Sequence, residues 1–109
     1  MIKIAICDDE KEFRSMIEEM LNQYIKNTDT EAQVDIFTNP SELIDATENG
    51  TIYDIYLLDI YMPGITGMSF ATELRSRDIK SSIIFLTSST DHALEAFGVN
   101  ATHYLLKPF

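Results

Sequence analysis

Residues 52–60 have the sequence IYDIYLLDI, an almost continuous apolar run that carries an aspartate, Asp59, next to its end. This composition is typical of a strand in a parallel sheet covered on both faces, because neither face then meets water. The run therefore predicts a buried central strand. It also places a carboxylate at the C-terminal end of that strand, where open parallel sheets bind their ligands.

Apolar patterns on either side of this stretch predict the remaining elements. Further strands are expected at residues 2–7, 33–37, 82–87 and 104–106. Helices are expected at residues 13–25, 40–49, 67–77 and 91–97, the first because its apolar residues recur in steps of three and four. Strands that alternate with helices in this way predict an α/β fold with a parallel sheet and right-handed crossovers.

Two of these helices have recognisable starts. Asp9 is a suitable N-cap for the first helix, since its carboxylate can accept a hydrogen bond from a free backbone N–H. Asn39 followed by Pro40 predicts the start of the second, because proline fits the first helical position. That second helix is expected to end near Asn49 and Gly50.

Length and charge restrict the classes of function that fit. The chain has 109 residues, enough for one domain. Eight Lys and Arg against eighteen Asp and Glu give a net charge of −10, which argues against binding of nucleic acid or an anionic membrane by this segment. A single cysteine, Cys7, excludes an internal disulfide, and the N-terminus lacks a signal peptide, so we expect a cytoplasmic protein.

Charged and hydroxyl side chains follow four of the five predicted strands. They are Asp8 and Asp9, Asp59, Thr87 and Lys107. Each one alone has a plainer explanation, as a helix cap, a turn residue or a solvated strand end. The C-terminal ends of parallel strands meet at one edge of the sheet, however, so we expect these side chains to converge there.

The chemistry of the set follows from its charge. Clustered carboxylates repel one another unless a cation lies between them, and oxygen ligands favour Mg²⁺. Aspartate can act as a nucleophile and form an aspartyl phosphate, and Asp59 is our choice because its strand is central. Lys107 and Thr87 would then neutralise or hydrogen-bond the other phosphoryl oxygens.

Four motifs in this order resemble the receiver domain of bacterial two-component response regulators, and the match covers the whole chain. They are CDDE at 7–10, LDIYMPGITG at 58–67, FLTS at 85–88 and YLLKPF at 104–109. Residues 93–97 and 103–109 further resemble receivers that precede a LytTR-type DNA-binding domain. The resemblance implies a flavodoxin-like (CheY-like) five-stranded parallel sheet of order 2-1-3-4-5. It also implies that residues 1–109 are a receiver truncated before its fifth helix.

The resemblance also implies roles for individual residues. A sensor histidine kinase would transfer a phosphoryl group to Asp59, and Mg²⁺ would bind Asp8, Asp9, Asp59 and the backbone carbonyl of Tyr61. Lys107 would contact the phosphoryl group, and the peptide bond between Lys107 and Pro108 can be cis. Thr87 would move toward the phosphoryl group, and Tyr104 would swing inward with it. Those roles make the domain a phosphoacceptor that handles its own side chain rather than an enzyme that turns over a substrate.

The expected output is a population shift at the face formed by the fourth helix and fifth strand. That face would control a C-terminal effector domain, expected to regulate transcription, and would favour a homodimer.

We add the hypothesis that the ring of Tyr61 shields the acyl phosphate from water. His92 and His103 are expected to be non-catalytic, and Glu10 is either a first-turn helix acid or a residue that orients a metal-bound water.

Three other functions are compatible with parts of this pattern. A phosphatase of the haloacid dehalogenase type would need a second acid two residues after the nucleophile, where Tyr61 stands. An FMN or nucleotide binder would need a phosphate-binding loop after the first strand, where Asp8, Asp9 and Glu10 stand instead. The remaining alternative is a phosphate-independent, receiver-like scaffold that binds partners.

Overall fold

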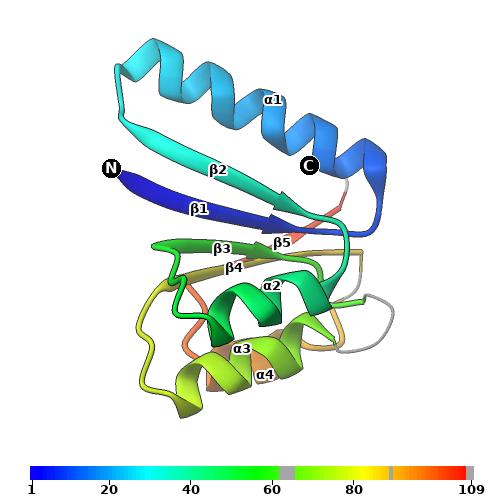
Figure 1. The fold of residues 1–109 in the computed structure, drawn as a ribbon. Helices are drawn as coiled ribbons and strands as arrows, with labels where there is room; N and C mark the ends of the chain where they lie inside the picture. Colours follow the sequence, from blue (N-terminus) through cyan, green and yellow to red (C-terminus); the bar gives the residue numbers. More distant parts are fainter. Residues whose placement is uncertain (62–65, 89, 108–109) are drawn as a thin grey trace.

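The computed structural model describes residues 1–61, 66–88 and 90–107. Strands and helices alternate along them (Figure 1) in the order β1 Ile2–Cys7, α1 Lys11–Thr28, β2 Ala32–Phe37, α2 Pro40–Glu48, β3 Ile55–Leu58, α3 Gly67–Ser76, β4 Ser82–Thr87, α4 Ala93–Gly98 and β5 His103–Leu106. The expected loop at residues 62–64 and the bond between Lys107 and Pro108 lie outside the described residues.

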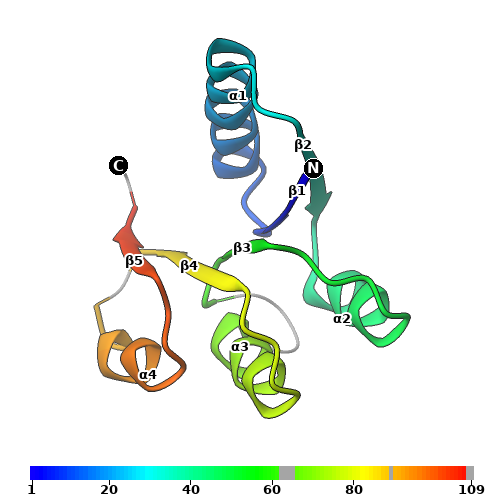
Figure 2. The same ribbon diagram turned by 90° about the vertical axis from the view of Figure 1, so that its left-hand side faces the viewer.

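The strands form one parallel sheet of order β2-β1-β3-β4-β5, as predicted. Figure 2 shows α1 on one side of the sheet and α2, α3 and α4 on the other. The register aligns Cys7 of β1 with Leu58 of β3, and Leu58 with Phe85 of β4. The residues that follow these strands therefore leave the sheet at nearly the same level of one edge.

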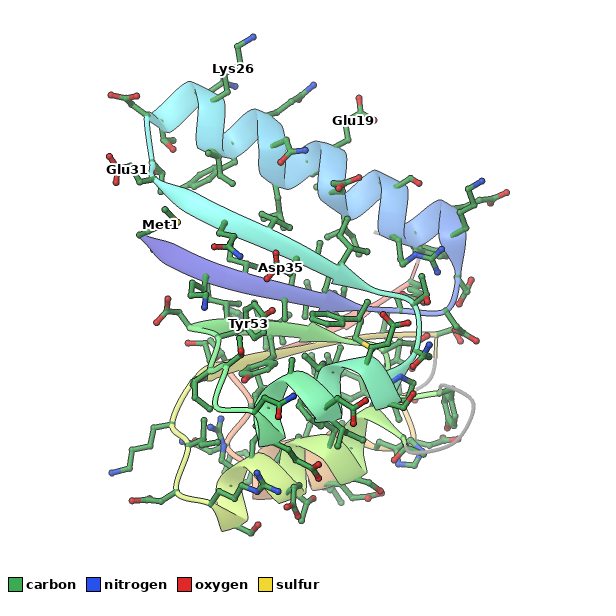
Figure 3. All side chains as sticks on the ribbon, in the orientation of Figure 1. Met1, Glu19, Lys26, Glu31, Asp35 and Tyr53 are labelled. Carbon is green, nitrogen blue, oxygen red and sulfur yellow. The ribbon has the colours of Figure 1, made fainter. Side chains whose placement is uncertain are left out.

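Each face of the sheet has its own core. On the side of α2 and α3, the buried side chains include Tyr56, Leu58, Phe70, Leu74 and Phe85. On the side of α1, a second cluster contains Ile4, Ile6, Ile17, Leu57 and Leu86. Polar side chains of α1, among them Glu19 and Lys26, point away from the sheet (Figure 3). The central strand is thus covered on both faces, which accounts for its continuous apolar sequence.

Two sequence expectations were wrong in detail. The central strand was predicted over residues 52–60 but extends only from Ile55 to Leu58. Tyr53 and Ile60 are buried outside the strand, so the apolar run indicates burial over a longer stretch than strand pairing. Tyr53 instead donates its hydroxyl hydrogen bond to Asp35 of β2 (2.7 Å; both are labelled in Figure 3).

The start of the first helix also differs from the prediction. Glu10, not Asp9, occupies the N-cap position of α1, and its side chain makes no capping hydrogen bond. The preceding turn is held by Asp8, whose Oδ1 accepts a hydrogen bond from the Glu10 backbone N–H at 2.8 Å. The second helix start is confirmed, because Asn39 Oδ1 accepts from the Glu42 backbone N–H at 3.1 Å and Pro40 opens α2.

Arg75 of α3 fastens two loops at the opposite edge of the sheet from the acidic strand ends. Its guanidinium donates hydrogen bonds to four backbone carbonyls, those of Val99 (2.7 Å), Ile79 (2.7 Å), Ser81 (2.9 Å) and Asn100 (3.2 Å). Two of these carbonyls directly follow α4, where a positive charge is favourable. Arg75 therefore fixes the C-terminal end of α4 to α3.

We predict that Arg75→Ala lowers the free energy of unfolding by about 2–3 kcal/mol, because hydrogen bonds to charged groups are lost and carbonyls are left without a partner. The matched control is Arg77→Ala, which removes an exposed ion pair with Glu73 (2.9 Å) and should cost less than about 1 kcal/mol. Urea denaturation measures both. Equal losses in the two variants would contradict this role of Arg75.

Candidate functional site

Three side chains from three different strand ends meet at the C-terminal edge of the sheet. Asp8 follows β1, Asp59 follows β3 and Lys107 follows β5. The Lys107 Nζ lies 2.8 Å from Asp8 Oδ2 and 3.1 Å from Asp59 Oδ2. A third carboxylate, Glu10, lies 2.9 Å from the same ammonium. The convergence expected for Asp8, Asp59 and Lys107 is therefore present in the structure.

Backbone hydrogen bonds hold these residues where the strands end. The Asp59 N–H donates to the Cys7 carbonyl at 3.0 Å, so the pairing of β1 with β3 continues one residue beyond the strand. The Lys107 N–H donates to the Thr87 carbonyl at 2.7 Å and extends β5 in the same way. Gly67 is required nearby, because a Cβ at that position would overlap the Asp59 carbonyl oxygen.

Both buried aspartates are held by the same pattern of contacts. In each, Oδ1 accepts a backbone N–H from two residues further along the chain: Glu10 for Asp8 (2.8 Å) and Tyr61 for Asp59 (3.2 Å). In each, Oδ2 faces the Lys107 ammonium. Asp8 is 0% exposed and Asp59 is 3% exposed, so two carboxylates depend on one buried cation for charge compensation.

This crowding changes the titration of the site. The pKa of Asp59 is raised to about 6: burial is the largest cause and the charge of Asp8 adds to it, while the hydrogen bond and charge of Lys107 oppose both. Burial alone would lower the pKa of Lys107, but its hydrogen bonds to Asp8, Glu10 and Asp59 outweigh burial and raise that pKa above its usual value. Asp59 is thus a carboxylate whose ionised form is poorly compensated.

Two other residues named from the sequence, Thr87 and Tyr104, lie on the neighbouring strands β4 and β5. Thr87 is fully buried at the end of β4, and Tyr104 packs against Phe85 with ring centroids 6.3 Å apart. Asp9 is exposed and does not belong to the described group of converging carboxylates. Its assignment as a metal ligand stays a prediction.

Two features of the site were not predicted from the sequence. Glu10 joins Lys107 directly, and its only sequence signal is that it follows the two aspartates. Tyr61 contacts His92, which is 31 positions away in the sequence, and no sequence pattern indicates this pair.

Cys7 is a buried core residue, as expected. The pKa of its thiol is raised to about 12, mainly by burial and then by the negative charges of nearby carboxylates.

The group of carboxylates is suited to a divalent cation. Asp8, Glu10 and Asp59 each offer a carboxylate oxygen, and these oxygens lie within 4.8 Å of one another. Oxygen donors of this kind match the preference of Mg²⁺ rather than that of zinc, which favours sulfur and nitrogen. The donor set therefore fits a magnesium ion.

A family model described as the response regulator receiver domain matches residues 4–109. The chain belongs to that family. Its relatives include the positive alginate biosynthesis regulatory protein of Pseudomonas aeruginosa, 35% identical over 98% of this chain and 42% of the relative. The sensory transduction protein LytT of Oceanobacillus iheyensis is 35% identical over 99% of this chain and 43% of the relative. Sensory transduction proteins named LytT and LytR thus occur among the relatives, in agreement with the subfamily resemblance.

Solved receivers have the same fold. The response regulator TrrA of Thermotoga maritima, in complex with Mg²⁺-BeF, aligns with a TM-score of 0.80 at 31% identity over 100% of this chain and 89% of that chain. This receiver spans only about two fifths of the two curated relatives named above (42% and 43%). In the part of the chain that the structure describes, no helix has the length and apolarity needed to cross a bilayer.

The raised pKa of Asp59 gives a prediction for stability. The folded protein binds a proton at Asp59 more tightly than the unfolded chain, so this residue makes stability fall as pH rises from about 4 to about 6. We expect Asp59→Asn to raise the free energy of unfolding by about 1–2 kcal/mol at pH 7 in EDTA, and by nothing at pH 4. Denaturation of both proteins at the two pH values measures this. A variant that is less stable than the parent at pH 7 would contradict it.

Proposed function

We propose that this receiver accepts a phosphoryl group from a sensor histidine kinase on Asp59 and uses it to switch a C-terminal output. One observation carries the proposal: Asp59 is a buried, poorly compensated carboxylate that shares the Lys107 ammonium with Asp8. Such a carboxylate is a nucleophile beside a cation that can stabilise an incoming phosphoryl group.

The transfer step needs few groups from the protein. A carboxylate oxygen of Asp59 attacks phosphorus, the new P–O bond forms as the P–N bond to the kinase histidine breaks, and the electron pair leaves with the imidazole. Lys107 then neutralises charge on the phosphoryl oxygens from its place 3.1 Å from Asp59. Asp8, Asp9, Asp59 and the Tyr61 carbonyl would hold Mg²⁺, which would supply further positive charge to those oxygens when bound. The Mg²⁺-BeF complex of the relative TrrA supports this part of the proposal.

The switch would act through the neighbouring strands. Thr87 ends β4 and its carbonyl accepts the Lys107 N–H, so the two residues that would contact the phosphoryl group are already tied together. We infer that Thr87 moves toward the phosphoryl group and that Tyr104 moves inward with it. On α4, Leu94 is 88% exposed and Phe97 is 87% exposed. These side chains give the α4–β5 face apolar surface for an output domain or a second copy of the chain.

The output domain and the last helix of the receiver complete the proposal. The names of the relatives LytT and LytR support a transcriptional output carried by a LytTR-type domain. We further propose that a fifth helix covers the face of the sheet beside α1. An apolar cavity of about 350 Å³ lies there, and it is lined by residues of α1, β3, β4 and β5 that include Met20, Tyr24 and Leu105.

Phosphorylation is tested by mass. After incubation with acetyl phosphate and Mg²⁺, we expect intact mass spectrometry to show a gain of one phosphoryl group. The gain should be absent without metal and in Asp59→Asn. It should persist in Asp45→Asn, which changes an aspartate of α2 that is outside the described group of converging carboxylates. A parent protein that binds Mg²⁺ but gains no mass would contradict the proposal and favour the phosphate-independent scaffold.

The side chain of Tyr61 should affect how long the phosphoryl group survives. Its backbone N–H donates to Asp59 Oδ1, so the residue that carries the ring is in direct contact with the carboxylate that would be phosphorylated. We expect Tyr61→Asn to shorten the half-life of the phosphorylated protein, because a smaller polar side chain admits water. The half-life is measured by following the loss of the phosphorylated mass after acetyl phosphate is removed. An unchanged half-life would show that the ring does not shield the site.

A further inference from the structure

His92, which directly precedes α4, contacts three separate parts of the molecule. Its Nε2 lies 2.8 Å from the hydroxyl of Tyr61, and its Nδ1 lies 2.8 Å from Glu95 Oε1 on α4. A backbone hydrogen bond joins His92 to the Tyr104 hydroxyl on β5. The rings of Tyr61 and His92 also meet edge to face, with centroids 5.3 Å apart and planes at 69°. One residue thus links the segment after β3, the start of α4 and the middle of β5.

These contacts form a continuous path that begins at Asp59. The Tyr61 backbone N–H donates to Asp59 Oδ1 at 3.2 Å, and the Tyr61 hydroxyl meets His92. From His92 the path divides toward Glu95 and toward Tyr104. The carboxylate proposed to receive the phosphoryl group is therefore joined by hydrogen bonds to both elements of the proposed switch face.

Burial indicates why the hydrogen bond matters to Tyr61. The side chain of His92 is 27% exposed, while Tyr61 is 47% exposed and belongs to neither core cluster. Packing alone therefore constrains the Tyr61 ring weakly. β3 and β4 are neighbours in the sheet, so the bond from Tyr61 to His92 ties together the connections that leave these two strands.

We propose that His92 is a positioning residue, which holds the Tyr61 ring beside Asp59 and couples that ring to α4 and Tyr104. This inference rests on the proposed function, and it deepens it by naming the residue through which the switch face sets the lifetime of the phosphoryl group. Movement of Tyr104 changes its hydrogen bond with the His92 backbone and, through His92, the hold on Tyr61. His92 itself touches no reacting atom.

The contact is tested first in the unphosphorylated protein. Fluorine NMR of protein containing 3-fluorotyrosine gives one resonance for each tyrosine, and Tyr61→Phe identifies that of Tyr61. We expect His92→Ala to shift the Tyr61 resonance and His92→Gln, which keeps a hydrogen-bonding group, to shift it less. His103→Ala, which changes the exposed histidine of β5, is the matched control and should leave it unchanged. A Tyr61 resonance that does not respond to His92→Ala overturns the inference, whether or not the protein takes up phosphate.

The coupling is tested next by phosphoryl lifetimes. We expect Tyr61→Phe and His92→Ala each to shorten the half-life about two- to tenfold, the range set by the net loss of one hydrogen bond. The double variant should lose no more than the single variants, because both remove the same contact. His92→Gln should restore part of the half-life, and His103→Ala should match the parent.

The possible failures are distinguishable. Single variants that keep the parental half-life, or effects that add fully in the double variant, overturn the role of His92 while leaving phosphorylation of Asp59 in place. A parent protein that takes up no phosphoryl group overturns the proposed function and the kinetic role of His92 with it. The fluorine shift reports on the contact independently of both.

Discussion

The ammonium of Lys107 compensates three carboxylates that two segments, the β1–α1 turn and the end of β3, bring to one edge of the sheet. It lies within 3.1 Å of an oxygen of Asp8, Glu10 and Asp59. With Asp8 and Asp59 both buried, removal of this cation would leave two charges without compensation, which is strongly unfavourable. The same arrangement leaves the negative charge of Asp59 only partly compensated. A bound cation or a covalent phosphoryl group would change this unfavourable charge energy.

The strand order of the sheet makes this arrangement possible. Parallel pairing in the order β2-β1-β3-β4-β5 places the ends of β1 and β3 side by side and carries β5 to the far edge. Lys107 is nevertheless held in place, because its backbone N–H donates to the Thr87 carbonyl and its ammonium nitrogen lies 4.5 Å from the centroid of the Phe13 ring. Order in the sheet, rather than proximity in sequence, creates the site.

Much of this could be predicted from the sequence. Alternating patterns predicted the parallel sheet and the edge at which Asp8, Asp59 and Lys107 meet, because parallel strands direct their C-terminal ends the same way. The strand order came from the resemblance to receiver domains. The cap of α1 and the contacts of Glu10 and His92 could not be predicted. They depend on where side chains point after a strand ends and on pairs far apart in sequence, and neither leaves a periodic signal.

Phosphorylation of Asp59 requires the Lys107 ammonium to exchange a carboxylate contact for a contact with the phosphoryl group. A crystal structure of this chain with Mg²⁺ and beryllofluoride, a phosphoryl mimic, tests that exchange most directly. It should show beryllium on a carboxylate oxygen of Asp59, the Lys107 ammonium on a fluorine, and the ion pair with Asp8 broken or lengthened. Beryllofluoride absent from Asp59, with Lys107 still bound to Asp8 and Glu10, would contradict the account.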